Sequence, residues 1–111
     1  MSITELAKLR QVTSETLRYY DRIGLITPDY VDPQTRYRYY SIRQYEKLGT
    51  IKELRQLGMS IHDITDYFSG RNLRKSHQLL LHQLELLEEE IRKQQLLSEI
   101  LRRKLHFLSE I

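Results

Sequence analysis

The C-terminal stretch, residues 73–111, constrains the fold more than any other feature of the chain. It contains no glycine and no proline, so nothing in it interrupts a helix. One helix of that length is roughly 60 Å long, at about 1.5 Å per residue. The rest of a 111-residue chain can build one modest core, which covers only part of such a helix. The sequence therefore predicts a small domain, residues 1–70, followed by a long helix, residues 71–111.

Apolar side chains on this helix follow the alternating three- and four-residue spacing of a coiled-coil seam. The seam positions are Leu80, Leu84, Leu87, Ile91, Gln94, Ser98, Leu101, Leu105 and Leu108. A second apolar line consists of Leu97, Ile100, Phe107 and Ile111. Because a lone helix leaves these side chains in water, we expect a coiled-coil homodimer in which the apolar seam residues make the contacts. The alternative is a helix that folds back on its own domain.

Composition excludes several classes of protein. Cysteine is absent, which excludes disulfides, thiolate metal sites and cysteine nucleophiles. The N-terminus shows no long apolar run, so neither a signal peptide nor a membrane span is predicted, and we expect a cytoplasmic protein. The net charge of +3 is too small to indicate a nucleic-acid partner. However, six cations and only two acids lie between Arg36 and Arg55, and all eight tyrosines lie between Tyr19 and Tyr67.

The first part of the chain predicts two helices with a short connection. Ser2 and Glu5 form a capping box, in which each side chain satisfies a free backbone N–H of the first turn. The second helix begins at Thr13 or Ser14 and ends at Gly24, which can adopt a left-handed conformation. The residues expected to face inward are Leu6, Ala7, Leu9, Leu17 and Ile23. Joined through residues 10–12, these helices are a helix-turn-helix candidate.

The next segment predicts a β-hairpin and a second pair of helices. Residues 30–31 and 37–39 alternate around a turn that contains Pro33, which is typical of a hairpin of about three residues a side. Ser41 with Gln44, and Ser60 with Asp63, open two helices that end at Gly58 and Gly70. The inward positions expected on the first of these are Ile42, Tyr45, Leu48, Ile51, Leu54 and Leu57.

Five motifs share their order and spacing with one known family. They are residues 3–8 (ITELAK), 16–21 (TLRYYD), 23–26 (IGLI), 37–40 (YRYY) and 57–60 (LGMS). In these motifs the chain resembles the DNA-binding and dimerisation region of a MerR-family transcriptional regulator. Residues 28–33 followed by YRYY resemble in particular the multidrug-responsive branch typified by the BmrR regulator.

The resemblance implies a mainly α fold. A winged helix-turn-helix head with four short helices and a β-hairpin wing precedes a long C-terminal helix that forms an antiparallel coiled-coil dimer. It implies a homodimer that binds a pseudo-palindromic promoter and activates transcription by bending and untwisting an overlong spacer for RNA polymerase. Such a protein is associated with the bacterial nucleoid. We expect no effector domain within these residues, and a small-molecule inducer only if a further C-terminal domain exists.

The resemblance also implies which residues contact double-stranded DNA. Base edges come within reach of the start of the second helix, and backbone phosphates contact its middle, the wing and the end of the third helix. The implied DNA-binding residues are Thr13, Ser14, Thr16, Arg18, Tyr19, Tyr20, Arg36, Tyr37, Arg38 and Arg55. Taken singly, each arginine or tyrosine is equally well explained as a solvated or packing residue. Tyr39, Tyr40 and Tyr45 are assigned to packing.

Two residues depart from the family pattern. Gln11 in the first turn and Arg36 in the wing turn stand where the family usually has glycine. A positive φ at either residue costs about 1 kcal/mol of strain, and Arg36 is a candidate for an additional phosphate contact.

No catalytic or metal site is predicted. The histidines lack companion ligands at metal-binding spacing, and no nucleophile, base and oxyanion set is present. These histidines are His62, His77, His82 and His106. We therefore expect neither a cofactor nor enzymatic activity. The alternative to a transcriptional regulator is a coiled-coil adaptor whose small helical head binds another protein.

Overall fold

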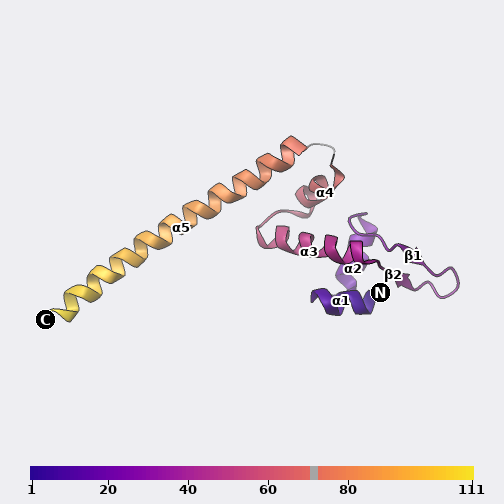
Figure 1. Cartoon of the computed structure of the whole chain (residues 1–111), viewed down its shortest axis with the longest axis horizontal. Coiled ribbons are helices and arrows are strands. Elements are labelled where there is room, and N and C mark those ends of the chain that lie inside the picture. The colour runs from indigo at the N-terminus through magenta and orange to yellow at the C-terminus, as the bar shows by residue number, and fades with distance from the viewer. Residues whose placement is uncertain (71–72) are drawn as a thin grey trace. The chain divides into compact units, whose positions relative to one another are not determined.

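The computed structural model describes residues 1–70 and 73–111. Its elements are α1 (Ile3–Arg10), α2 (Ser14–Arg22), β1 (Tyr30–Val31), β2 (Arg38–Tyr39), α3 (Ile42–Gln56), α4 (Ile61–Ser69) and α5 (Leu73–Ser109). The chain forms two compact units, Met1–Arg71 and Asn72–Ile111. We call the first unit the head and describe the two separately (Figure 1). The predicted mainly α fold with a hairpin and a long C-terminal helix is confirmed.

Capping interactions set the ends of α1 and α2. The Ser2 hydroxyl accepts a hydrogen bond from the Glu5 N–H at 3.1 Å, and the Glu5 carboxylate accepts one from the Ser2 N–H at 3.3 Å. Helix α1 ends at Gln11, whose φ of 56° is left-handed. Thr13 caps α2 by accepting from the Thr16 N–H at 3.0 Å. The capping box predicted at Ser2 and the start of α2 predicted at Thr13 or Ser14 are confirmed.

The core of the head lies among α1, α2, α3 and α4. Its fully buried large side chains are Leu6, Leu17, Ile26, Leu48, Ile51, Met59 and Ile64. Burying side chains of this size stabilises a fold by roughly 1.5–3 kcal/mol each. Helix α1 contacts both α2 and α3, and α3 contacts α4. Five of these core residues lie on the helices, while Ile26 and Met59 come from the segments between them.

Several inward positions were wrongly predicted. Leu9 is 59% exposed, because the inward face of the short helix α1 is formed by Leu6, Ala7 and the guanidinium side of Arg10. Ile42 is 66% exposed at the first residue of α3, and Leu57 is exposed just beyond its last residue. Ile23 lies past the end of α2 and is also exposed. Helical spacing predicts a face, but it does not say how far along that face the core extends.

Strands β1 and β2 form a hairpin of two residues a side, which is shorter than predicted. They pair antiparallel, with Tyr30 opposite Tyr39 and Val31 opposite Arg38. An isolated hairpin is barely stable in water, so its contacts with the head are decisive. The Met1 carbonyl accepts from the Tyr40 N–H at 2.7 Å, and the Tyr40 side chain is buried. We call residues 30–39 the wing.

A close contact joins α1 to α3. The Arg10 Nε donates to the Tyr45 carbonyl at 2.9 Å, and the Arg10 guanidinium lies 3.7 Å from the centroid of the Tyr45 ring. The Lys52 ammonium donates to the Arg10 carbonyl. A Cβ placed on Gly49 would come within 2.6 Å of Arg10 Nη2. Gly49 therefore leaves the space that Arg10 occupies.

Helix α5 is continuous over 37 residues, as the absence of glycine and proline predicts. The seam residues Leu84, Leu87 and Ile91 are about half exposed, while Leu101, Leu105 and Leu108 are nearly two-thirds exposed. The second apolar line is exposed as well, with Phe107 at 66%. None of the described helices combines the length and the apolar character needed to cross a membrane.

Candidate nucleic-acid interface

The start of α2 presents hydroxyl side chains that also serve the helix itself. The Thr13 hydroxyl caps α2 and lies 2.8 Å from the Thr16 hydroxyl. Thr13 is exposed, and Ser14 and Thr16 are half-buried. Base readout needs donors or acceptors at the surface. Thr13 and Thr16 therefore offer a pre-ordered hydroxyl pair, with Ser14 next to it in the chain.

The three predicted contact residues in the middle of α2 separate into two groups. Arg18 is exposed, and its side chain makes no ion pair or hydrogen bond with a described residue. Tyr19 is 42% exposed, and its ring lies 5.8 Å from the Arg22 guanidinium. Tyr20 is only 8% exposed, and burial raises the pKa of its hydroxyl. The prediction that Tyr20 offers a ring face to DNA is at odds with this burial, because α2 must also contribute to the core.

Side chains from α2, the wing and the start of α1 enclose a hollow of about 420 Å³. We call it the arginine hollow. Its lining residues are Ser2, Ile3, Thr4, Arg18, Arg36, Tyr37 and Arg38. The sequence motifs that predicted Arg18 and the wing residues lie apart in the chain, and the fold brings them to one place. Three guanidinium groups in one hollow make it a positively charged surface.

Asp21 fixes one of these arginines. The Asp21 carboxylate lies 3.1 Å from the Arg38 Nε, with both side chains about one-third exposed or less. This ion pair joins α2 to β2 and was not predicted, although Asp21 belongs to the TLRYYD motif. Burial raises the pKa of the nearby Tyr40 hydroxyl, and the Asp21 charge adds to that rise while Arg38 and Arg18 oppose it. The charges of Asp21, Arg38 and Arg18 therefore all act on the Tyr40 hydroxyl, in opposite directions.

Wing geometry follows from its turn. The Asp32 carboxylate accepts from the Gln34 N–H at 2.8 Å and the Thr35 N–H at 3.1 Å. The Arg36 N–H donates to the Asp32 carbonyl at 2.8 Å, and Arg36 adopts a left-handed φ of 65°. Tyr37 follows with 66% of its side chain exposed. The turn therefore carries Arg36 and Tyr37 into the lining of the hollow.

Arg55 lies outside the arginine hollow. Its Nη1 donates to the Met59 carbonyl at 2.9 Å, which closes the turn between α3 and α4. The residue is nevertheless exposed, and a guanidinium retains further donors after one hydrogen bond. Arg55 can therefore serve both the turn and a ligand.

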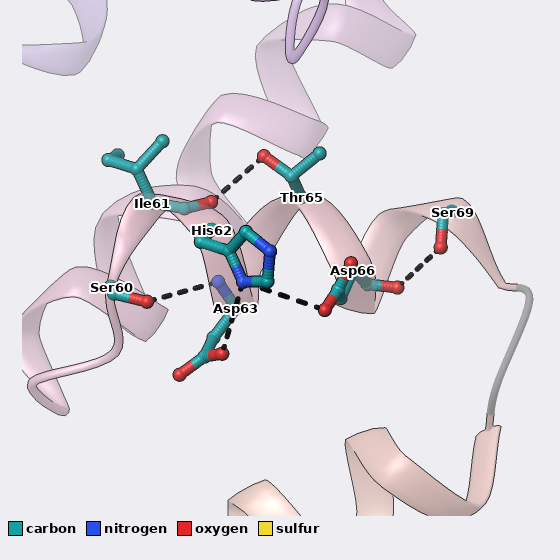
Figure 2. A network of polar contacts seen from close by, with 7 residues as sticks. All are labelled: Ser60, Ile61, His62, Asp63, Thr65, Asp66 and Ser69. Carbon is teal, nitrogen blue, oxygen red and sulfur yellow. Dashed lines mark hydrogen bonds and ion pairs between the residues drawn. The ribbon is translucent and has the colours of Figure 1, made fainter.

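One cluster was missed by sequence reasoning. His62 Nδ1 lies 3.8 Å from Asp63 Oδ1 and 3.7 Å from Asp66 Oδ2, so His62 does have companion carboxylates (Figure 2). The three ligand atoms lie within 4.8 Å of one another. The i, i+4 spacing of His62 and Asp66 on one helix was the available signal. The His62 side chain is 81% exposed, and the group is accounted for by solvated ion pairs when the imidazole is protonated.

The sequence was compared with known protein families, and one family matches most of the chain. Residues 1–71 match the model of the MerR HTH family regulatory proteins. The chain is 36% identical over 110 residues to the multidrug-efflux transporter 1 regulator of Bacillus subtilis, which covers 99% of this chain and 34% of that relative. The chain thus spans about a third of the length of the curated relatives it matches.

Solved structures share the fold. The N-terminal part of MtaN, the Bacillus subtilis multidrug transporter activator, aligns over 95% of this chain and 97% of its own, with a TM-score of 0.69 and 25% identity. A cryo-EM structure of an EcmrR-DNA complex in EcmrR-RPo aligns over 99% of this chain and 39% of its own, with a TM-score of 0.64 and 29% identity. The predicted winged helix-turn-helix architecture and the resemblance to multidrug regulators are confirmed.

Proposed function

Because this chain belongs to the MerR family of helix-turn-helix regulatory proteins, we propose that it binds promoter DNA as a homodimer and regulates transcription. The arginine hollow is the observation that carries this proposal. Its three arginines come from α2 and the wing, and only Arg38 is paired with an acid among the described residues. Phosphate oxygens are the acceptors that guanidinium groups bind in bidentate geometry.

The proposed interface has a reading part and a positioning part. Helix α2 enters the major groove with its N-terminal end, so that Thr13, Ser14 and Thr16 approach base edges. The residues proposed to contact the sugar-phosphate backbone are Arg18, Tyr19, Arg36, Tyr37, Arg38 and Arg55. Tyr20 belongs to the core, where it supports the helix. Phosphate contacts fix the register of the head on the duplex, and base contacts give it specificity.

The second unit is proposed to bring two copies of the chain together. We assign residues 1–70 to DNA binding and residues 71–111 to dimerisation through an antiparallel coiled coil. The dimer contacts are assigned to Leu80, Leu84, Leu87, Ile91, Leu101, Leu105 and Leu108. Half-exposed leucines along one face of α5 support this assignment, because such a stripe is stabilised by burial against a partner. Two heads then bind the two halves of a pseudo-palindromic site.

Regulation follows from deforming the DNA between the two heads. A dimer bound at both ends bends and untwists an overlong spacer, which realigns the promoter elements that RNA polymerase recognises. One solved relative is bound to DNA and another relative regulates a multidrug-efflux transporter. We extend both properties to this chain, with genes of drug efflux as the regulated class. No enzymatic activity is assigned, and the place of action is the bacterial nucleoid in the cytoplasm.

A mobility shift with the DNA upstream of the gene tests the proposal. We expect the wild-type dimer to form a salt-sensitive complex, and Arg18→Ala to weaken it at least tenfold, about 1.4 kcal/mol. Since each dimer loses two phosphate contacts, the slope of log K against log salt should fall by about two. The matched control is Arg103→Ala, an exposed arginine on α5, which should leave the affinity unchanged.

Two outcomes would contradict this function. A dimeric wild-type protein that shifts no DNA at low salt is incompatible with a DNA-binding regulator and leaves the protein-binding adaptor as the better reading. Equal loss of binding in the Arg18 and Arg103 variants would show that general positive charge, and not the arginine hollow, carries the interaction.

A further inference from the structure

We propose that charged residues beside the seam of α5 select a single alignment with a second copy of the chain, in which the two-fold axis lies level with Leu96. The inference rests on the dimer of the proposed function and adds to it the residues that choose the partner and the register. Its supports are the order of polar residues in the seam, the signs of the charges that flank the seam, and the loss of both matches in other alignments.

The order of polar and apolar residues in the seam is the same in both directions from Leu96. In an antiparallel pair centred there, Gln94 of one helix lies opposite Ser98 of the other, so each polar side chain meets a hydrogen-bonding partner. The layers further out are apolar on both sides, and they pair Ile91 with Leu101, Leu87 with Leu105, and Leu84 with Leu108. No polar seam residue then faces an apolar one.

Two triplets of like charge lie on α5 at equal distances from Leu96. Residues 88–90 are all glutamate, while residues 102–104 are arginine, arginine and lysine. An antiparallel pair centred on Leu96 brings the acidic triplet of each copy level with the basic triplet of the other. A parallel pair would instead bring each triplet level with its own counterpart, where like charges repel one another.

The outer residues of each triplet flank the seam. In an antiparallel coiled coil, each flanking position lies beside the equivalent position of the other helix. Glu88 is then beside Arg102 of the other copy, and Glu90 is beside Lys104. All four side chains are exposed on the single chain, and none of them forms an ion pair with a described residue. The dimer would therefore pair charges that a lone helix leaves in solvent.

Other antiparallel alignments lose both matches. Shifting one helix by a heptad in either direction places Gln94 and Ser98 opposite leucine or isoleucine, which leaves a buried amide without a partner. The same shift separates the acidic flanking residues from the basic ones, so that no flanking pair joins opposite charges. Polar and charged residues of α5 thus favour the same register.

Charge reversal tests the flanking pairs. Glu88→Lys with Glu90→Lys should weaken the dimer by about tenfold or more in sedimentation, because each ion pair becomes a repulsion. Adding Arg102→Glu and Lys104→Glu should restore it. This charge-swapped variant should not exchange chains with the wild type, as followed by mass spectrometry, and the discrimination should fade at about 1 M salt, where the Debye length is about 3 Å. Glu89→Lys is the matched control, because the middle residue of the triplet lies away from the seam.

Crosslinking tests the register directly, since the chain has no cysteine of its own. Leu97 flanks the seam next to the axis, so Leu97→Cys should join two copies through a short thiol-specific crosslinker. Leu101→Cys should not, because its two copies would lie about 15 Å apart along the helix axis. A parallel dimer would give the opposite result, because identical seam residues meet in it.

The outcomes separate this inference from the proposed function. A wild type that is monomeric in solution would contradict the proposed dimer itself. A dimeric wild type that crosslinks through Leu101→Cys, or that exchanges chains freely with the charge-swapped variant, would overturn the register alone. So would a loss of the dimer in Glu89→Lys as large as that in the flanking reversal, because overall charge and not the facing pairs would then decide association.

Discussion

Arg10 joins α1 to α3 through its side chain and its backbone. The guanidinium stacks on the Tyr45 ring, Nε donates to the Tyr45 carbonyl, and the Arg10 carbonyl accepts from Lys52. A charged hydrogen bond contributes roughly 1.5–3 kcal/mol, and a cation-π contact adds about 0.5–1 kcal/mol. The α1–α3 contact therefore depends on the small volume of Gly49, which Arg10 approaches closely.

Gly49→Ala should destabilise the head by about 1 kcal/mol. Alanine gains about 1 kcal/mol of helix propensity over glycine, but its Cβ would lie 2.6 Å from Arg10 Nη2 and displace the guanidinium from Tyr45. The atoms approached are the flexible end of the Arg10 side chain, so the guanidinium is expected to move, and we expect the weakened hydrogen bond and ring contact to outweigh the gain. A shift of this size should lower the melting temperature by several degrees, measured by circular dichroism.

A double-mutant cycle provides the control. In an Arg10→Ala background nothing occupies the space beside Gly49, so Gly49→Ala should become stabilising. A coupling energy of about 1 kcal/mol or more is expected for residues in contact. If the Gly49 substitution has the same effect in both backgrounds, the close approach to Arg10 is not what keeps glycine at this position.

Some residue conformations could be predicted from the sequence and others could not. Gln11 and Arg36 replace glycines of the family pattern, and both adopt the positive φ that this position implies. The burial of Tyr20, the Asp21–Arg38 ion pair and the Arg10 contact were missed. Positive φ is a local property of a turn, whereas burial and ion pairing depend on which elements meet in space.

At the scale of elements, the turn of the wing is held by polar contacts. Its turn is organised by the Asp32 carboxylate, which accepts from the Thr35 and Gln34 N–H groups. These hydrogen bonds hold the pKa of Asp32 below its ordinary value, with the Thr35 N–H as the larger cause. The protonated carboxyl is a poorer acceptor, so these two hydrogen bonds stabilise the turn most while Asp32 is ionised.

The contribution of Asp32 to stability should therefore vanish in acid. A pKa lowered by folding stabilises the protein at pH values above the unfolded pKa of about 3.9, and this stabilisation is lost as the pH falls through the folded value. Between about pH 5 and pH 7, the melting temperature of the wild type should exceed that of Asp32→Ala by a constant margin. The margin should shrink below about pH 4.

The difference in melting temperature between the wild type and Asp32→Ala removes the effect of other titrating groups. Glu5, whose pKa is also lowered by its hydrogen bonds with Ser2, titrates equally in both and cancels. A margin that stays constant down to the acid limit of folding, or that widens there, would show that the Asp32 charge does not organise the turn.

Element boundaries were predictable where a capping residue marks them. Ser2, Thr13 and Ser60 each accept from a backbone N–H in the first turn of their helix. The hairpin was predicted with about three residues a side and has two, and the inward faces of α1 and α3 were extended to residues that are exposed. Caps are local hydrogen bonds that a sequence encodes directly, but strand length depends on where the hairpin leaves the head.

For the whole molecule, the long helix determines the expected assembly. Leu87→Asp combined with Leu101→Asp should convert the dimer to monomers, because each substitution places a charge in the apolar seam of both helices. Sedimentation velocity at tens of micromolar (roughly) measures the change, and promoter binding should fall with it since two heads no longer act together.

Leu81→Asp is the matched control variant for the test of the dimer seam. Leu81 is an exposed leucine of α5 outside the seam, so its substitution should leave the dimer intact. A monomeric wild type, or dissociation by Leu81→Asp as complete as that by the seam variants, would contradict the assigned contacts. The length of α5 was predictable from its composition, because the absence of helix-breaking residues is a one-dimensional property of the sequence. The seam stays a prediction.

Because α5 is uninterrupted, its length also sets how far apart two heads would lie in a dimer. Inserting seven residues would lengthen the helix by about 10.5 Å and return the apolar stripe to within about 20° of its original face. Inserting four would lengthen it by about 6 Å and rotate everything beyond by about 40°. In a dimer, whole heptads would thus retune the distance between the two DNA half-sites in discrete steps, while other insertions would first misalign the two copies.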